Sequence, residues 1–263
     1  MSNLLQDVSF DFSHRRVLVT GATAGIGLGI ATLFQQNGAE VIVTGTRPTA
    51  ADYTVELSAF QYRQLDVTSP ASIAELAQGI DALDILVNNA GGTGQLPEDF
   101  EQALALNLLS VQRMTMAMWP KLHARKNSTW GNIVNIGSMV SNYATSYYPG
   151  YGASKAAVTQ MTKTYANLLA PHRIRVNCIL SGSVMTRMTE PYLANAESVN
   201  LIADKTSMRR WASPEELAGP VLLLCSSAAS FVTGAALLVD GGYSLLDLPY
   251  DRASPPPDWL LPE

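Results

Sequence analysis

The sequence has few of the residues that disulfide frameworks and metal sites require, with two cysteines and three histidines among 263 residues. Cys178 and Cys225 each lie in an apolar run without metal-ligand spacing, so we expect both to be small core residues. The motifs HExxH, CxxC and Gly-x-Ser-x-Gly do not occur. We therefore predict that the protein holds no metal and is not a serine hydrolase.

Basic clusters and long apolar runs are also scarce. The net charge is −5, and nucleic acids or anionic membranes would need a basic surface, so neither is an expected partner. No apolar stretch reaches the roughly 18 residues of a membrane span, and the first residues lack the order of a signal peptide. We therefore expect a cytoplasmic protein that acts on a small molecule.

What the sequence does have is a regular alternation of two patterns. Short β-branched runs, typical of strands buried on both faces, alternate with longer segments of 3.6-residue periodicity. The alternation predicts an α/β fold: one Rossmann-type, doubly wound parallel sheet of about seven strands with helices on both faces. The predicted strands are 16–20, 39–45, 60–67, 83–89, 131–138, 173–180 and 235–242, and predicted helices include 70–80, 98–125, 151–170 and 214–227.

Three segments depart from this alternation. Residues 46–59 are short for a full crossover helix, and residues 183–212 are polar and irregular, which predicts a mobile flap. Residues 247–263 contain three consecutive prolines and predict an extended tail outside the sheet. The expected organisation is one domain, 1–246, which includes the flap, followed by the tail.

A glycine-rich turn, TGATAGIG, follows the first predicted strand and precedes an amphipathic helix. Gly21, Gly25 and Gly27 permit a tight turn and close approach of the backbone to a pyrophosphate, and the start of the helix favours an anion. In this context the turn predicts a nucleotide site, with a purely structural turn as the alternative. No Gly-Lys-Ser/Thr follows, which excludes a P-loop.

The stretch PGYGASKAAV, residues 149–158, places Tyr151 and Lys155 on one helix face among small residues. A phenol has an ordinary pKa near ~10, and a neighbouring cation favours the phenolate and lowers that pKa. Such a phenol can exchange a proton with a substrate hydroxyl or carbonyl. Taken alone, the pair is also compatible with an ordinary helix surface.

Together with further motifs, these patterns resemble the short-chain dehydrogenase/reductase family over residues 14–244. The glycine spacing is Gly-x-x-x-Gly-x-Gly, NNAG (88–91) ends the fourth predicted strand, and LNLLSV (106–111) carries Asn107. Ser138 ends the fifth strand, and Tyr151 and Lys155 form Tyr-x-x-x-Lys. Residues 209–242 are similar to the C-terminal segment of the family.

The resemblance implies a catalytic tetrad of Asn107, Ser138, Tyr151 and Lys155. Tyr151 would be the acid/base, while Lys155 would lower its pKa and hold the nicotinamide ribose. Ser138 would hydrogen-bond the substrate oxygen, and Asn107 would hold a water that links Lys155 to solvent. The hydride would move to or from the nicotinamide. Taken singly, Ser138 and Asn107 are also compatible with ordinary structural roles.

The choice between NAD and NADP depends on the end of the second strand, where NAD enzymes place an acid for the ribose 2′-hydroxyl. Gly45 stands there, followed by Thr46 and Arg47. No carboxylate at this position would repel a 2′-phosphate, and Arg47 could bind one. The sequence therefore favours NADP. NAD stays open, because Ala24 stands where NADP-using relatives often have a second basic residue.

The resemblance also implies the remaining cofactor contacts. Ser181 replaces the proline that the family usually has after the sixth strand, which should loosen that turn without abolishing the nicotinamide site. The expected cofactor residues are Gly21, Thr23, Gly25, Ile26, Gly27, Thr46, Arg47, Asp66, Val67, Asn89, Ala90, Gly91, Tyr151, Lys155, Gly182, Val184 and Thr186.

The expected substrate is a small or medium secondary alcohol or ketone, because no cluster of Arg or Lys marks a carboxylate or phosphate clamp. Relatives are commonly tetramers, so we expect a homotetramer, with Trp259, Leu260 and Leu261 anchoring the tail on a neighbouring subunit. The alternatives are an NAD-preferring enzyme and a regulatory protein that binds the cofactor without turnover. Residues expected to contact substrate are Ser138, Val140, Tyr148, Tyr151, Ser183, Met185 and Met188.

Overall fold

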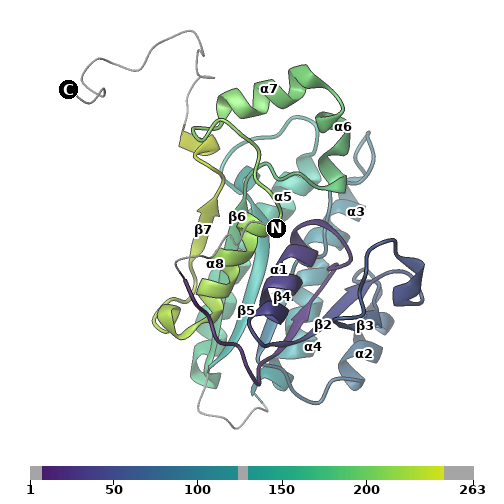
Figure 1. The fold of residues 1–263 in the computed structure, drawn as a ribbon, viewed down its shortest axis with the longest axis vertical. Helices are drawn as coiled ribbons and strands as arrows, with labels where there is room; N and C mark the ends of the chain where they lie inside the picture. The colour runs from purple at the N-terminus through teal and green to yellow at the C-terminus, as the bar shows by residue number, and fades with distance from the viewer. Residues whose placement is uncertain (1–7, 124–129, 246–263) are drawn as a thin grey trace, which may run out of the picture.

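The computed structural model describes residues 8–123 and 130–245, which form a seven-stranded sheet between two layers of helices (Figure 1). Every strand pairing is parallel, and the order is β3-β2-β1-β4-β5-β6-β7. The predicted doubly wound α/β fold is confirmed. The strands are β1 (Arg16–Val19), β2 (Glu40–Gly45), β3 (Gln61–Gln64), β4 (Ile85–Asn88), β5 (Gly131–Ser138), β6 (Ile174–Ser181) and β7 (Ala236–Val239).

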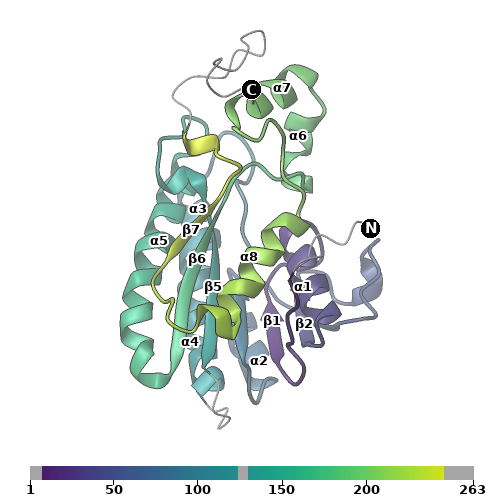
Figure 2. The same ribbon diagram turned by 60° about the vertical axis from the view of Figure 1, so that its left-hand side comes forward.

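Two groups of helices cover the two faces of the sheet (Figure 2). On one face lie α1 (Gly25–Gln36) and α8 (Glu215–Cys225), and on the other lie α2 (Pro70–Gln78), α4 (Ser110–His123) and α5 (Pro149–Leu169). Gly29 lets α1 and α8 pack closely, because a Cβ there would lie 3.1 Å from the carbonyl oxygen of Pro214.

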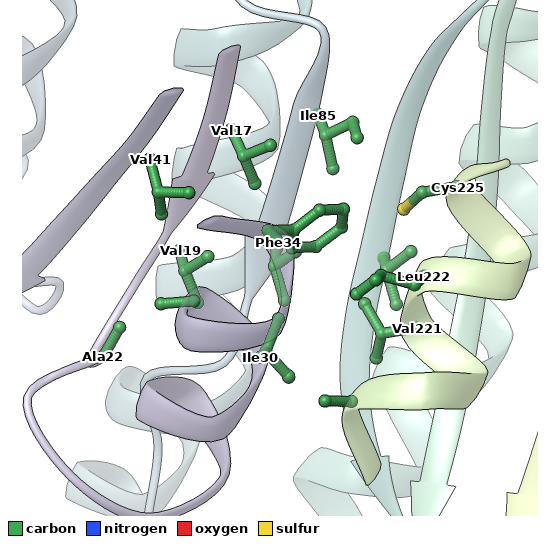
Figure 3. Close-up of a cluster of buried hydrophobic side chains, with 14 of the residues drawn as sticks. Val17, Val19, Ala22, Ile30, Phe34, Val41, Ile85, Val221, Leu222 and Cys225 are labelled. Carbon is green, nitrogen blue, oxygen red and sulfur yellow. The ribbon is translucent and has the colours of Figure 1, made fainter. Parts of the chain in front are cut away.

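The core alternates along the strands as the sequence pattern requires. Val17 and Val19 of β1 face α1 and α8, whereas Leu18 between them faces the opposite helices. Phe34 of α1 and Leu222 of α8 meet over the same face of the sheet (Figure 3). Burying each such side chain stabilises the fold by about 1.5–3 kcal/mol.

The single helix predicted over 98–125 is interrupted in the structure. It consists of α3 (Phe100–Leu104), a π-helical turn (Ala105–Leu109) and then α4. A π turn inserts an extra residue into the helical repeat, and such turns are frequent at functional sites. The turn contains Asn107, so the interruption falls on a predicted catalytic residue.

Residues 183–212, the flap, are predicted to be irregular but are partly helical in the structure. It carries α6 (Glu190–Leu193) and α7 (Ala196–Lys205), which lie above the carboxyl ends of the strands (Figure 1). Asn195 caps α7 by accepting a hydrogen bond from the Glu197 amide at 2.9 Å. The sequence pattern did not predict α7, because this helix is short and much of it is exposed.

The predicted tail, including Trp259, Leu260 and Leu261, lies outside the described residues. Its boundary and its proposed anchoring therefore stay predictions. None of the helices within the described ranges is long and apolar enough to cross a membrane.

Candidate active site

The glycine-rich turn between β1 and α1 is held by close packing. Gly21 and Gly25 have φ values of +62° and +54°, which side chains rarely adopt. A Cβ on Gly21 would lie 2.9 Å from the Cα of Ala90, in the turn after β4. Gly27 packs behind the turn, where a Cβ would lie 2.8 Å from the Gly21 carbonyl oxygen and would collide with the Asn89 amide.

Two polar side chains fix this turn against the end of β4. The hydroxyl of Thr20 accepts hydrogen bonds from the amides of Asn89 and Ala90, each at 3.0 Å. The side-chain amide of Asn89 donates to the carbonyls of Thr20 and Gly21 at 2.9 and 3.1 Å. Sequence reasoning missed Thr20, because its partners lie about 70 residues away in the chain.

A cavity of about 690 Å³ opens beside this turn, at the carboxyl ends of the strands. It lies where β1 and β4 are neighbours, which is the crevice in which open α/β sheets bind ligands. Ligand pockets commonly have volumes of this order. The predicted cofactor residues that line it are Gly21, Thr23, Gly25, Ile26, Thr46, Arg47, Asp66, Val67, Asn89, Ala90, Gly91, Tyr151, Lys155 and Thr186.

Three predicted cofactor residues do not line the cavity. Besides Gly27, Gly182 packs on β7's end, where a Cβ would lie 2.5 Å from the Cα of Asp240. Val184 is buried in the core and pairs with Ala212 through an isolated bridge. These three residues pack behind the residues that line the cavity and do not contribute to its lining.

One end of the cavity lies at the end of β2. Arg47 stacks on the ring of Tyr53, with its guanidinium carbon 4.9 Å from the ring centroid. The hydroxyl of Tyr53 accepts a hydrogen bond from the Arg47 amide at 2.9 Å and fills the space that a Cβ on Gly45 would enter. An acidic side chain at position 45 therefore does not fit beside Tyr53 in this arrangement. No sequence pattern pointed to Tyr53, because its position beside Gly45 depends on the path of the loop after β2.

The other end of the cavity holds Tyr151 and Lys155, both on α5. The buried ammonium of Lys155 donates to the carbonyl of Ile136 on β5 at 2.8 Å and lies 5.6 Å from the Tyr151 ring centroid. Ser138 is buried at the end of β5 and does not line the cavity. The structure therefore brings the predicted acid/base and its lysine to the same wall.

The surroundings shift the pKa values of both α5 residues. Burial raises the pKa of Tyr151 above its ordinary value, and a hydrogen bond with Ser138 partly opposes that rise. Burial lowers the pKa of Lys155 from 10.5 to about 8, opposed by the nearby Cys178. The sequence predicts that Lys155 lowers the Tyr151 pKa. In the structure the largest effect is burial, which raises it.

Asn107 lies in the π turn with its side chain fully buried. Its carbonyl oxygen accepts from the Gly92 amide at 2.9 Å, and its amide donates to the carbonyls of Gly92 and Ala103 at 2.9 and 3.0 Å. The side chain therefore fixes the loop after β4 that borders the cavity. A Cβ on Gly91 would lie 2.6 Å from the Asn107 oxygen and 3.5 Å from the Lys155 nitrogen, so these two groups flank one glycine.

The predicted substrate residues are distributed between the cavity and the flap. Met188 lines the cavity, whereas Val140, Tyr148, Ser183 and Met185 do not. The hydroxyls of Tyr148 and Tyr192 lie 3.4 Å apart and join the loop before α5 to α6. This hydrogen bond, with burial, raises the pKa of Tyr192 to about 12. Arg187, to which no sequence pattern pointed, also lines the cavity, and its neighbour Thr186 lies against Gly25 of the glycine turn.

The residues present fit a dinucleotide: a glycine cradle at a helix start, an arginine at one end and a buried tyrosine–lysine pair at the other. A family model described as Enoyl-(Acyl carrier protein) reductase matches residues 21–244. A solved structure described as a short chain dehydrogenase/reductase family protein is 34% identical, with a TM-score of 0.75, covering 89% of this chain and 100% of that chain. The chain is a short-chain dehydrogenase/reductase.

Two further proteins similar to this dehydrogenase/reductase have names that state an activity or a bound cofactor. A 3-oxoacyl-(acyl-carrier-protein) reductase, FabG, from Thermotoga maritima is 35% identical over 240 residues, covering 86% of this chain and 96% of the relative. The Pseudomonas aeruginosa RhlG/NADP active-site complex has a TM-score of 0.82 and 32% identity, covering 89% of this chain and 97% of that chain. The protein is therefore an NAD(P)-dependent oxidoreductase.

Within residues 8–123 and 130–245, no group of three or more His, Cys, Asp or Glu side chains is arranged to hold a metal ion. Cys178 and Cys225 are both buried free thiols, as predicted.

Proposed function

We propose that this enzyme transfers a hydride between NADP and a secondary alcohol or the corresponding ketone, with Tyr151 as the proton donor and acceptor. The observation that carries the proposal is one continuous cavity with Arg47 at one end and Tyr151 with Lys155 at the other. A dinucleotide bound along this cavity would reach from Arg47, which would bind a phosphate, to Tyr151, which would transfer the proton. A relative named as a 3-oxoacyl reductase supports a ketone as the class of carbonyl.

The dinucleotide, when bound, donates or accepts the hydride. Tyr151 then gives a proton to the ketone oxygen, or takes it from the alcohol. Ser138 hydrogen-bonds the same oxygen as charge develops there, which favours the transition state. Lys155 keeps a positive charge beside the phenol at neutral pH, since its pKa of about 8 leaves most of it protonated.

The preference for NADP is supported by the end of β2. Gly45 brings no carboxylate that would repel a 2′-phosphate, and Tyr53 occupies the space of such a side chain. Arg47 is held on the Tyr53 ring at the rim of the cavity, and its planar guanidinium matches phosphate geometry. A solved relative bound to NADP is consistent with this preference.

The substrate side favours an apolar or mixed compound. Met185, Met188 and Tyr192 of the flap are well exposed, and methionine adapts to different apolar shapes. We therefore propose a small or medium ketone or alcohol without a strongly anionic group near the reacting carbon.

The test is a panel of ketones and secondary alcohols, followed at the nicotinamide absorbance with NADP(H) and NAD(H) separately. We expect turnover with at least one member and a higher kcat/KM with NADP(H). Higher kcat/KM with NAD(H) would overturn the cofactor preference alone. Binding of either cofactor without turnover of any member would favour the regulatory alternative.

We also propose a homotetramer. Exposed apolar side chains lie on α4 and α5, at Met116 and Leu168, and near the β7 edge of the sheet, at Phe231 and Leu237. Contiguous exposed apolar patches are typical of protein–protein contacts, and we infer that these side chains belong to two such patches. Light scattering coupled to size-exclusion chromatography measures the mass, and a monomer would contradict this assignment.

A further inference from the structure

The first turn of α5, which carries Tyr151, lacks a capping residue of its own. The N-cap position is Tyr148, whose side chain makes no capping hydrogen bond. Pro149 follows and has no N–H, and the amide of Gly152 already donates to the Tyr148 carbonyl at 3.0 Å. Two amides, those of Gly150 and Tyr151, are therefore left without partners inside the helix.

Glu98 supplies both partners from a distant loop. One carboxylate oxygen accepts from the Gly150 amide at 2.6 Å, and the other accepts from the Tyr151 amide at 2.8 Å. Hydrogen bonds to an ionised acceptor are stronger than neutral ones, and an anion is favoured at a helix start. Gly150 allows the approach, since a Cβ there would lie 3.0 Å from the carboxylate and 3.2 Å from the Cα of Phe100.

Glu98 also belongs to the loop that borders the cavity. Gly92, Thr93 and Gly94 of this loop line the cavity, and Asn107 binds both backbone groups of Gly92. The loop is thus attached to the π turn at one end and to the amide of Tyr151 at the other. A change at Glu98 would loosen the loop and the first turn of α5 together.

We propose that Glu98 is a positioning residue for the reaction: its carboxylate fixes the backbone of Tyr151 and thereby the place of the phenol relative to the cavity. The role of Glu98 in turnover rests on the proposed function of Tyr151. The capping itself does not, and the two parts can be measured separately.

The experiment compares wild type with Glu98→Ala and Glu98→Gln in the full chain. The control is Glu101→Gln, an exposed acid in the first turn of α3 that removes the same charge nearby. Glu98→Gln keeps the size of the side chain but leaves one amide without an acceptor, and it serves if the alanine variant does not fold. Hydrogen exchange measured on the peptide over residues 149–156 reports the cap without any substrate.

We expect the amides at the start of α5 to exchange about 10-fold faster in the Glu98 variants, and at the wild-type rate in Glu101→Gln. We expect kcat, normalised to the sites that bind cofactor, to fall about 10- to 100-fold, with the cofactor Kd changed less than about twofold. A merely structural role would lower the number of active sites and leave kcat per site unchanged.

Unchanged exchange in the Glu98 variants would overturn the proposal. Faster exchange with an unchanged kcat per site would overturn it as well, because the cap would then not position the phenol. A wild-type protein that turns over no alcohol or ketone would instead overturn the proposed function, while the exchange result would still report on the cap.

Discussion

The ammonium of Lys155 is directed at the carbonyl of Ile136, 2.8 Å away, while the ring centroid of Tyr151 lies 5.6 Å from the same nitrogen. The lysine is therefore fixed to β5 by a hydrogen bond while its ammonium lies near the Tyr151 ring. Because the cavity is shared by both side chains, a ligand there contacts the pair as one unit.

Replacing Tyr151 with phenylalanine removes the proton donor and keeps the ring. We expect kcat to fall about 10³-fold, because general acid–base catalysis contributes about 10²- to 10⁴-fold. The cofactor Kd, measured by nicotinamide fluorescence, should change little. Tyr147→Phe is the matched control, since Tyr147 is exposed in the preceding loop and does not line the cavity. Equal activities of the two variants would contradict the assignment of Tyr151.

The buried charge of Lys155 should show in the pH dependence of stability. The folded pKa is about 8 and the ordinary value is 10.5, so between these values the unfolded chain holds the proton and the folded chain does not. The free energy of unfolding contributed by Lys155 therefore rises with pH across this window. Below pH 8 the folded state carries the full penalty, which corresponds to about 3 kcal/mol.

Denaturant unfolding of wild type and Lys155→Met at several pH values measures this effect. The free energy of unfolding of wild type minus that of the variant should increase from pH 8 to 10.5. Burial raises the pKa of Cys178 to about 11 and Lys155 opposes that rise, so both proteins also carry Cys178→Ala, which leaves the lysine as the titrating difference. A difference that does not change with pH would show that the ammonium is not desolvated.

The fold was predictable because its signals are local, whereas several site contacts are not. The strands β1, β2, β4, β5 and β6 are almost wholly buried, whereas the edge strands β3 and β7 are exposed or half-buried and are predicted from their alternation with helical segments. The cap from Glu98 to Tyr151 joins residues 53 positions apart, and only the packing of α3 against α5 brings them together. The same holds for Tyr53 under Gly45, a contact that depends on the path of one loop.

Arg47 should contribute to affinity for NADP and not for NAD. We expect Arg47→Ala to raise the Kd for NADP about 10- to 100-fold, since a hydrogen bond to a charged group contributes about 1.5–3 kcal/mol. The Kd for NAD should stay within about twofold, because NAD has no 2′-phosphate for the guanidinium. Arg63→Ala is the control, as an exposed arginine on β3 that does not line the cavity. Equal losses for both cofactors would mean that Arg47 does not read the 2′-phosphate.

Tyr53 should decide whether an acid is tolerated at position 45. Gly45→Asp alone introduces a Cβ that collides with the Tyr53 hydroxyl, so we expect weakened binding of both cofactors. Gly45→Asp combined with Tyr53→Ala removes the Tyr53 contact and leaves the methyl of Thr23, 2.7 Å from the new Cβ, which can turn aside, so the carboxylate can reach the ribose 2′-hydroxyl. The double variant should then prefer NAD, measured as the ratio of kcat/KM values. Tyr53→Ala alone is the control, and NAD preference in the Gly45→Asp single variant would contradict the steric role of Tyr53.

Gly27 should be far less tolerant of a methyl group than Gly79, which follows the end of α2. A Cβ at Gly27 would lie 2.8 Å from the Gly21 carbonyl oxygen and 2.9 Å from the Cα of Ala22, both of them backbone atoms that cannot move independently. We expect Gly27→Ala to lower the free energy of unfolding by about 1–3 kcal/mol, because overpacking forces the helix away from the turn. At Gly79, after α2, the nearest atom would lie 3.6 Å from the new carbon, so Gly79→Ala should change stability by less than about 1 kcal/mol. Because Gly27 lies behind the cradle rather than in the cavity, its variant should also weaken cofactor binding through displacement of Gly21. Equal stabilities of the two variants in chemical denaturation would show that the turn and α1 are less tightly packed than these distances require.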